Sequence, residues 1–361
     1  MQDSTTPLRV ALVGYGFAGK TFHAPLIRRV SGLELGTVVS RDAGKVHADL
    51  PEVEVVADAA AAFADPRLDL VVIASPNDTH APLARAALEA GKHVVVDKPF
   101  ALDLSQAREL AAVAKREQRL LSVFQNRRWD TDFLGVRQAM EDGRLGDVTH
   151  FESHIDRFRP QVRVRWREQP GAGSGLWYDL GPHLVDQALC LFGVPDRVWA
   201  SLATQREGGE VTDWAHAVLE YGERRVILHA GMLVAGGSAR FTVHGTKGSA
   251  VKPKIDPQES QLLAGLRPGD AGWGEDPDEL LLYDGNGNVE RIAPPRGDQS
   301  RYYAAIRDAV RGQGANPVTP QQAIGVMAVI EAAIASASSG RAIPLALGEE
   351  ERNAWPNALR H

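Results

Sequence analysis

Cysteine is almost absent from this 361-residue chain, which contains only Cys190. One cysteine cannot form an intrachain disulfide or supply a four-cysteine metal site. An excess of positive charge is also lacking: the formal net charge is -6 at pH 7, which argues against general affinity for nucleic acids or anionic membranes. We therefore expect a protein of the reducing cytoplasm that binds neither nucleic acid nor a membrane.

Long apolar runs are lacking as well. No stretch approaches the roughly 20 residues that a membrane span requires, and residues 1–7 are too polar for the core of a signal peptide. No His-Glu-x-x-His pattern is present, so we expect no metal. What remains is an ordinary globular composition, 44% hydrophobic and 24% charged, in a chain long enough for two domains.

The first strong pattern is the stretch LRVALVGYGFAGK at residues 8–20. A short apolar run, typical of a strand buried on both faces of a parallel sheet, leads into three glycines in G-x-G-x-x-G spacing. This spacing permits a tight turn, a close approach of the backbone to a pyrophosphate, and close packing of helix on strand. The cofactor-binding residues predicted in this turn are Gly14, Tyr15, Gly16, Phe17 and Gly19.

The second predicted strand, residues 33–40, ends in Ser40 and Arg41, followed by Asp42. An acidic residue near this point of a dinucleotide-binding fold usually binds the ribose hydroxyls. A serine and an arginine suit a 2′-phosphate instead, because a guanidinium matches phosphate geometry. The pattern favours NADP, with NAD possible if Arg41 is only a solvated surface residue and Asp42 takes the ribose.

Strands and helices alternate over the first 124 residues. Strand-like runs at 68–74, 93–96 and 120–124 are separated by helical segments at 59–64, 79–90 and 104–118. This alternation is the pattern of a doubly wound parallel sheet. It predicts an α/β dinucleotide-binding domain over residues 1–124.

The pattern changes from residue 125 onward. Strand-like runs follow one another at 197–204, 214–221, 225–233 and 239–244, and Asp284–Gly287 has the sequence of a tight hairpin turn. Alternating arginines at 163, 165 and 167 predict a strand or extended segment with a solvated face, and the Gly-, Pro- and Asp-rich residues 252–278 predict a mobile loop. Helices at 300–311 and 320–336 and a strand-like run at 342–347 complete an α+β domain over residues 125–361.

Lys98 is the first candidate for chemistry. It follows a predicted parallel strand at the sheet edge where α/β proteins bind ligands, and Pro99 restricts it to an extended backbone. A lysine beside a positively charged nicotinamide can have a depressed pKa and transfer a proton. The alternative is a surface lysine without a function.

Asp179 and His183 are the second candidate. They stand four residues apart in a predicted helix that places Pro182 in its first turn, so both side chains lie on one face. The pair can set an imidazole against a substrate hydroxyl while the carboxylate orients it. Two alternatives stay open: a helix cap with a packed histidine, and a metal site that includes Asp186.

Five segments in this order resemble the glucose–fructose oxidoreductase/inositol dehydrogenase/rhizopine-catabolism (Gfo/Idh/MocA) family: VGYGFAGK, VVIASPNDTH, AGKHVVVDKPF, FQNRRWDTDF and YDLGPHLVDQ. The family's Glu-Lys-Pro motif reads Asp97-Lys98-Pro99 here. Within the family, GYGFAGKTFHAP, DKPF, NRRWDTDFL and ESHIDRFRPQVRVRWRE look most like the NADP-dependent scyllo-inositol dehydrogenase branch.

The resemblance implies a Rossmann domain followed by a domain built on a large open, mainly antiparallel sheet that often forms a dimer or tetramer interface. It implies that Lys98, Asp179 and His183 are the catalytic residues, with His183 as acid/base on the hydroxyl being oxidised. The implied cofactor-binding residues are Gly14, Tyr15, Gly16, Phe17, Gly19, Ser40, Arg41, Ser75, Pro76, Asn77, His80, Asp97, Lys98, Asn126 and Arg128. The implied substrate-binding residues are Lys98, Arg127, Trp129, Asp156, Trp166, Asp179 and His183.

The implied activity is hydride transfer between nicotinamide C4 and a secondary alcohol or ketone of a cyclic polyol or sugar. Such an enzyme needs no metal, because the cofactor supplies the hydride chemistry. The expected partners are a small polyol or sugar and further copies of the chain, as a homodimer or homotetramer. The alternative is a non-catalytic regulatory protein of the same fold that binds NAD(P) or a sugar.

Overall fold

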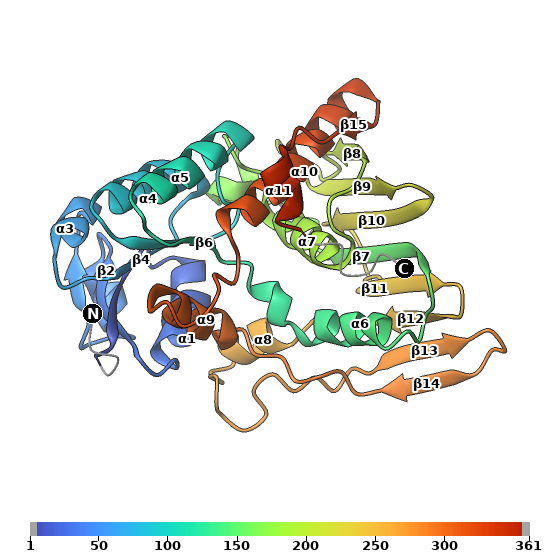
Figure 1. The fold of residues 1–361 in the computed structure, drawn as a ribbon, viewed down its shortest axis with the longest axis horizontal. Helices are drawn as coiled ribbons and strands as arrows, with labels where there is room; N and C mark the ends of the chain where they lie inside the picture. Colours follow the sequence, from blue (N-terminus) through green and yellow to red (C-terminus); the bar gives the residue numbers. More distant parts are fainter. Residues whose placement is uncertain (1–5, 356–361) are drawn as a thin grey trace. The chain divides into compact units, whose positions relative to one another are not determined.

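Two separate β-sheets form the framework of the computed structural model, which describes residues 6–355 (Figure 1). By its contacts the chain divides into two units. Unit 1 contains the described residues up to Asn126 together with Gln258–Gly274 and Asp298–Ala323. Unit 2 contains Arg127–Pro257, Glu275–Gly297 and the described residues from Ile324 onward.

Unit 1 is built on a six-stranded parallel sheet in the order β3-β2-β1-β4-β5-β6. Its central strands are mostly apolar and have no exposed surface at positions such as Val10, Leu12, Val72 and Val95, as expected for strands covered on both faces. This confirms the predicted doubly wound sheet. The strands are β1 Leu8–Val13, β2 Leu33–Val39, β3 Glu54–Val56, β4 Leu70–Ile73, β5 His93–Val96 and β6 Leu121–Val123.

Three helices of unit 1, α2, α3 and α5, begin where an aspartate side chain caps them. Asp42, Asp58 and Asp103 each accept a hydrogen bond from a backbone N–H in the first turn of the helix that follows. The helical segments are η1 Gly19–His23, α1 Ala24–Arg28, α2 Ala43–His47, α3 Ala59–Ala64, η2 Asn77–Thr79, α4 His80–Glu89, α5 Leu104–Arg116, η3 Asn126–Trp129 (which runs into unit 2), α8 Gln258–Leu263 and α9 Ser300–Val310.

The prediction of a continuous loop over 252–278 is wrong, because this stretch contains α8. The buried Gln258 side chain accepts a hydrogen bond from the backbone N–H of Gln299, which precedes α9. The Gly, Pro and Asp content of the segment indicated turns correctly but concealed a short helix that is held by tertiary contacts.

Unit 2 is built on a nine-stranded mixed sheet in the order β14-β13-β12-β11-β7-β10-β9-β8-β15. Only β7 and β10 pair in parallel, so the prediction of a large, mainly antiparallel sheet is confirmed. The predicted hairpin turn at 284–287 joins β13 to β14. The strands are β7 Val148–Asp156, β8 Arg197–Ala203, β9 Trp214–Tyr221, β10 Arg224–Gly231, β11 Phe241–Gly245, β12 Gly248–Lys252, β13 Leu280–Asp284, β14 Val289–Ile292 and β15 Ile343–Pro344.

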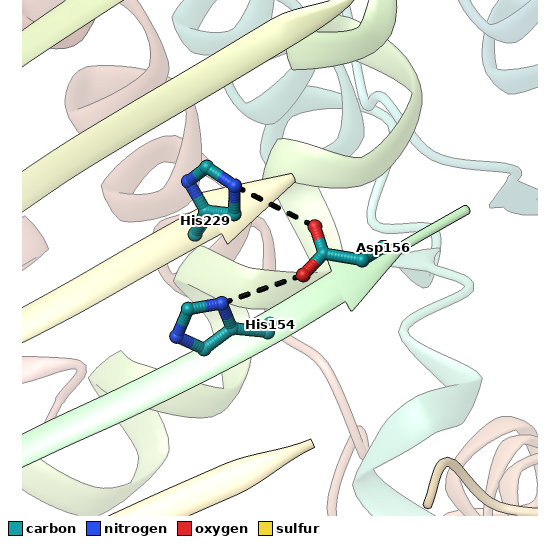
Figure 2. Close-up of side chains that lie close together, drawn as sticks. All are labelled: His154, Asp156 and His229. Atoms are coloured by element: carbon teal, nitrogen blue, oxygen red, sulfur yellow. Dashed lines mark ion pairs between the residues drawn. The ribbon is translucent and has the colours of Figure 1, made fainter. Parts of the chain in front are cut away.

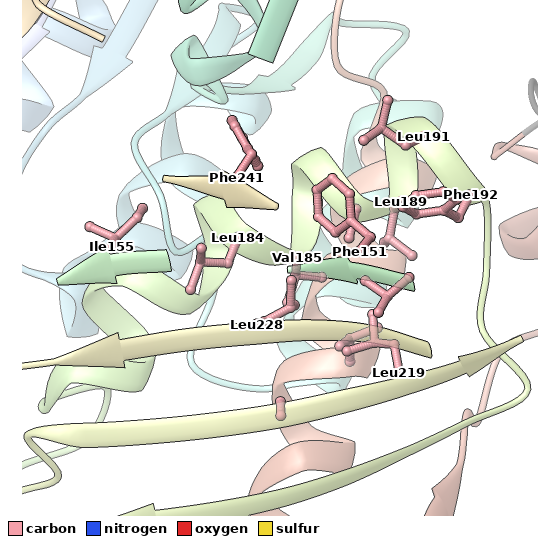
Figure 3. Packing of buried hydrophobic residues seen from close by; sticks show 14 of the residues in the cluster. Phe151, Ile155, Leu184, Val185, Leu189, Leu191, Phe192, Leu219, Leu228 and Phe241 are labelled. Carbon is pink, nitrogen blue, oxygen red and sulfur yellow. The ribbon is translucent and has the colours of Figure 1, made fainter. Parts of the chain in front are cut away.

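Helices α6 (Thr131–Glu141) and α7 (Leu176–Phe192) pack on one face of this sheet, α7 against β7, β9 and β10. Figure 3 shows side chains of the resulting core, among them Phe151, Val185 and Leu228, all of which are completely buried. Gly181 lets α7 approach α10 (Pro320–Ser339), because a Cβ there would stand 2.8 Å from a methyl carbon of Ile330. Two short helices remain in unit 2, η4 Trp166–Glu168 and α11 Glu349–Asn353.

Two sequence expectations in unit 2 differ from the structure. Of the strand or extended segment expected over the arginine alternation at 163–167, no strand forms, and the short helix η4 occupies Trp166–Glu168. Pro182 is the seventh residue of α7, beyond the first turn. Helix α10 is long and apolar enough for a membrane span by length and composition, although 61% of its most apolar window is buried inside the structure, as in a core helix.

His93 makes the stability of unit 1 depend on pH. The backbone N–H of Leu120 donates to Nδ1 of His93 at 2.9 Å, which requires an unprotonated nitrogen. Burial, helped by the charge of Arg119, lowers the pKa of His93 from 6.5 to about 4. The associated stability is complete above the unfolded-state pKa and is lost as the pH falls from there toward the folded-state pKa.

We expect unfolding of the wild type by urea to become easier by roughly 2 kcal/mol between about pH 7.5 and pH 5 through His93. His93→Asn keeps an acceptor near the Nδ1 position but does not titrate, so this variant should lose less stability over the same range. Equal losses in the two proteins would contradict the assignment.

Candidate active site

The glycine turn after β1 has the geometry that a pyrophosphate needs. Gly14 has φ +97°, and a Cβ on it would stand 2.7 Å from the carbonyl oxygen of Ala74. A Cβ on Gly19 would collide with the carbonyl oxygen of Gly14, whereas a Cβ on Gly16 would meet nothing within 4 Å. Two of the glycines are therefore required by the fold, and the third leaves open space beside the backbone, as the glycine next to a pyrophosphate does in dinucleotide-binding turns.

Tyr15 and Phe17 differ in their surroundings. Phe17 is 57% exposed. The buried Tyr15 donates to Asp49 at 3.3 Å, and burial together with this carboxylate raises the pKa of Tyr15 to about 12. It lines a cavity of about 420 Å³ that also includes Lys20 and Arg28.

Asp42, at the carboxyl end of β2, is the acidic candidate for binding the ribose, and it already makes local hydrogen bonds. Asp42 accepts from the backbone N–H of Lys45 at 2.9 Å as the cap of α2, and its own N–H donates to the Ser40 hydroxyl at 3.2 Å. Arg41 is exposed and has no ion-pair partner among residues 6–355. Its guanidinium is therefore available to an anionic ligand.

The turn after β4 is tied to the Lys98 segment by His80. Its Nε2 lies 3.0 Å from the carbonyl oxygen of Ser75, and its Nδ1 lies 2.8 Å from that of Pro99. The ring is buried, as is Asn77, and the backbone carbonyl of Pro76 accepts from Thr79. His80 thus connects the ends of β4 and β5, where the predicted cofactor-binding residues lie.

The buried side chain of Asp97 holds the backbone of Lys98 by a hydrogen bond. Its carboxylate accepts from the backbone N–H of Lys98 at 2.8 Å and lies 3.8 Å from Nε2 of the buried His23. Although burial opposes ionisation, His23 and the charge of Lys98 hold the pKa of Asp97 at about 2. On its other side, His23 contacts the Tyr303 hydroxyl at 2.5 Å. Lys98 is half-buried and follows an ionised, buried carboxylate.

Several predicted site residues at 126–129 make buried structural contacts. Asn126 is buried and Trp129 half-buried. Arg127 pairs with Asp130 at 2.9 Å, and Arg128 forms a bidentate pair with Asp186 at 2.7 and 2.8 Å. The carboxylate that a metal site would need from Asp186 is occupied by this arginine.

Helix α7 holds Asp179 in its first turn and His183 one turn later, and His183 is buried. The turn begins at Gly175, whose φ of +87° starts the helix with an N–H of Asp179 donating to its carbonyl. Nε of Arg167 lies 3.4 Å from the Asp179 carboxylate, and the same guanidinium stacks on the Trp166 ring at 4.5 Å. Arg167 thereby holds the Asp179 carboxylate, which lies one helical turn before His183.

Sequence reasoning missed the role of these arginines, which it interpreted as a solvated face. Buried Glu168 accepts from the backbone N–H of Arg163, from Arg165 at 2.7 Å and from Arg206 at 3.0 Å. This network fixes η4 and with it Trp166 and Arg167. The signal in the sequence was one glutamate amid the arginines, too small to predict which of them it would bind.

Asp156 has different neighbours from those expected of a substrate-binding residue. Its neighbour Ile155 belongs to the core under α7, so the Asp156 side chain faces the opposite side of the sheet, beside His154 and His229. Lys98 belongs to unit 1, and Asp179 and His183 belong to unit 2.

The parallel sheet and its glycine turn define unit 1 as a dinucleotide-binding domain. A family model described as the NAD-binding Rossmann fold of an oxidoreductase family matches residues 8–125, and one described as the C-terminal alpha/beta domain of that family matches residues 137–347. The chain belongs to the Gfo/Idh/MocA family of oxidoreductases.

Relatives resemble the chain over almost its full length. It is 55% identical to the oxidoreductase YdgJ of Escherichia coli (strain K12), covering 94% of this chain and 99% of the relative. It is 36% identical to scyllo-inositol 2-dehydrogenase (NADP(+)) IolW of Bacillus subtilis (strain 168), covering 94% and 96%. The crystal structure of an oxidoreductase from Klebsiella pneumoniae, 59% identical, superposes with a TM-score of 0.92 and 98% coverage of both chains.

The surroundings of Gly16 predict that a substitution there weakens cofactor binding without affecting folding stability. Gly16→Ala should leave thermal stability almost unchanged, because the added methyl meets no protein atom, but it should weaken NADPH binding by at least about tenfold because it fills the space beside the turn. Gly285→Ala, also in open space but in the β13–β14 hairpin, is the matched control. Unchanged NADPH binding by Gly16→Ala in a fluorescence titration would remove this turn from the cofactor site.

Proposed function

We propose that the protein is an NADP-preferring dehydrogenase that interconverts a secondary alcohol and a ketone on a cyclic polyol or sugar such as scyllo-inositol. The observation that carries the proposal is the Asp179–His183 pair, braced by Arg167, in a chain whose dinucleotide-binding turn leaves space for a pyrophosphate. The relative IolW, named as an NADP-dependent scyllo-inositol dehydrogenase, supports the choice of cofactor and substrate.

The residues of this chain would divide the proton chemistry among them. When bound, the nicotinamide cofactor would supply the hydride acceptor for oxidation of the carbinol carbon. An imidazole nitrogen of His183 takes the hydroxyl proton as general base, so the C–H and O–H bonds break and the carbonyl π bond forms. Lys98 would contribute a positive charge that stabilises a developing alkoxide. In the reverse reaction His183 returns the proton.

Asp179 would select for substrates with several hydroxyls. A carboxylate accepts hydrogen bonds only, and Nε of Arg167 lies 3.4 Å from this one. A substrate lacking the matching hydroxyl leaves this carboxylate incompletely bonded, which costs roughly 1–3 kcal/mol. The site therefore suits a polyol better than a simple alcohol.

Ser40 and Arg41 would select for NADP. Asp42 is occupied as the cap of α2, so the exposed Arg41 is the group that meets a 2′-phosphate. The proposal retains the cytoplasmic location and the homo-oligomeric state predicted from the sequence.

The direct test is absorbance at 340 nm with NADP or NAD and a panel of inositols, aldoses, sugar acids and simple secondary alcohols. We expect reduction of NADP with a cyclic polyol or sugar and little with simple alcohols. Tight NADPH binding without turnover on the whole panel would contradict the dehydrogenase assignment and favour a non-catalytic binding protein.

Lys98→Met should lower kcat by at least about 100-fold, the lower range for loss of a group that assists proton transfer, while NADPH binding changes little. Lys115→Met, which removes an exposed lysine on α5, is the control and should keep full activity. Turnover by Lys98→Met at the control's rate would exclude Lys98 from the reaction.

Arg41→Ala should raise KM for NADP by at least about tenfold and leave KM for NAD within about twofold, because only NADP carries the phosphate that Arg41 binds. The ratio of KM for NADP to KM for NAD in this variant serves as the control, because a general disturbance of the cofactor site would change both constants alike. Equal increases in KM for both cofactors would contradict the role of Arg41 and favour Asp42 as the residue that binds the ribose.

A further inference from the structure

The nine-stranded sheet has a second face, and β7 gives it an unusual composition. Along this strand Phe151, Ser153 and Ile155 point to the core, while His150, Glu152, His154 and Asp156 alternate with them and point away from α7. We call the face that bears these four residues the open face. Its groups are half-buried rather than fully solvated.

The neighbouring strands β10 and β9 add further titratable side chains to the open face, beside those of β7. In the sheet register His154 of β7 stands opposite His229 of the parallel strand β10, and His229 stands opposite His216 of β9. Directly paired residues of adjacent strands present their side chains on the same face. Three imidazoles therefore lie side by side across three strands, with the Asp156 carboxylate beside the first two.

Figure 2 shows how His154, Asp156 and His229 converge. Nδ1 of His154 lies 3.5 Å from Oδ2 of Asp156, Nε2 of His229 lies 3.6 Å from Oδ1, and the ligand-type atoms of all three residues lie within 4.8 Å of one another. Ligand atoms about 2.0–2.1 Å from a tetrahedral ion stand about 3.4 Å apart. The two nitrogen–oxygen separations match that spacing and are too long for hydrogen bonds.

Three of the four atoms that converge are left without a hydrogen bond. Nδ1 of His154 and both carboxylate oxygens of Asp156 are shielded from solvent and make no hydrogen bond of normal geometry. Leaving such buried polar atoms unbonded is unfavourable. A cation among them would satisfy all three at once.

The remaining ring nitrogens are held by neighbours, as the ligands of a metal usually are. Nε2 of His154 lies 2.9 Å from Glu152, which also contacts His150 at 2.8 Å. Nδ1 of His229 lies 3.4 Å from Nδ1 of His216. A carboxylate on the far nitrogen of a ligating histidine fixes its tautomer and aims the other nitrogen at the ion.

We propose that His154, Asp156 and His229 bind a divalent transition-metal ion of the Zn²⁺ class, separate from the dehydrogenase chemistry. Two imidazoles and one carboxylate suit such an ion, whereas Mg²⁺ and Ca²⁺ require oxygen ligands. The ligands stand on two neighbouring strands, so the ion connects β7 to β10. Because it binds the folded sheet alone, it stabilises the fold.

The test is a calorimetric titration of Zn²⁺ into the full chain, prepared without a histidine tag and treated with a chelator. We expect one ion per chain, binding at least about tenfold weaker in His154→Ala, in His229→Ala and in Asp156→Asn, and a rise in Tm with Zn²⁺ in the wild type only. Glu152→Gln keeps all three ligands and should weaken binding by about tenfold through the orientation of His154.

The matched control is His244→Ala, which removes an exposed histidine of β11 on the same sheet. It should bind Zn²⁺ like the wild type. If Zn²⁺ does not bind to the wild type, or if the ligand variants bind it as tightly as His244→Ala does, the cluster is an ion-pair network of histidines and carboxylates and the proposal is wrong. Should a variant not fold, the visible absorption of the wild-type Co²⁺ complex decides, because nitrogen–oxygen coordination gives a spectrum distinct from aqueous Co²⁺.

Discussion

The close approach of Gly19 to the carbonyl oxygen of Gly14 is the constraint on which unit 1 depends. Any side chain at position 19 would collide with that oxygen, and one at position 14 would approach Ala74 too closely. The helical segment after β1 can therefore start directly above the strand, next to the point where the order of the parallel strands reverses. Ligands of open α/β sheets bind at such a reversal. The fold and the cofactor site of unit 1 thus follow from the same two contacts.

In unit 2, polar side chains are held in place on a largely apolar helix. Most of α7 is buried against the sheet, yet Asp179 stays half-exposed in its first turn. Arg167 holds this carboxylate from a segment that Glu168 fixes in turn. The orientation of Asp179 therefore depends on a charged contact outside the helix, whereas the helix itself is held by packing.

The parts of the fold that depend on local pattern could be predicted from the sequence. Strand β5 and helix α3 begin and end where the pattern placed them, since apolar runs and capping residues act over a few residues. Strand β7 escaped prediction because His150, Glu152, His154 and Asp156 occupy the positions where an ordinary strand has neutral polar residues. Its alternation with Phe151, Ser153 and Ile155 was present but is visible only once the sheet is known.

The candidate site residues could be predicted where their placement depends only on nearby sequence. Lys98 after β5 and the i, i+4 spacing of Asp179 and His183 could be read directly. The bidentate pair of Arg128 with Asp186, and the ion pair of Arg167 with Asp179, join residues far apart or in irregular segments. No periodicity connects such residues, so their pairing depends on the tertiary structure.

The central claim is that the turn from Gly14 to Gly19, together with Ser40 and Arg41, holds NADP. The most direct measurement is a fluorescence titration of the purified protein with NADPH and, separately, with NADH. The account predicts saturable binding of one NADPH per chain, at least about tenfold tighter than NADH, with a difference that shrinks at high salt as the phosphate–arginine attraction is screened. Failure to bind either nucleotide, or tighter binding of NADH, would contradict it.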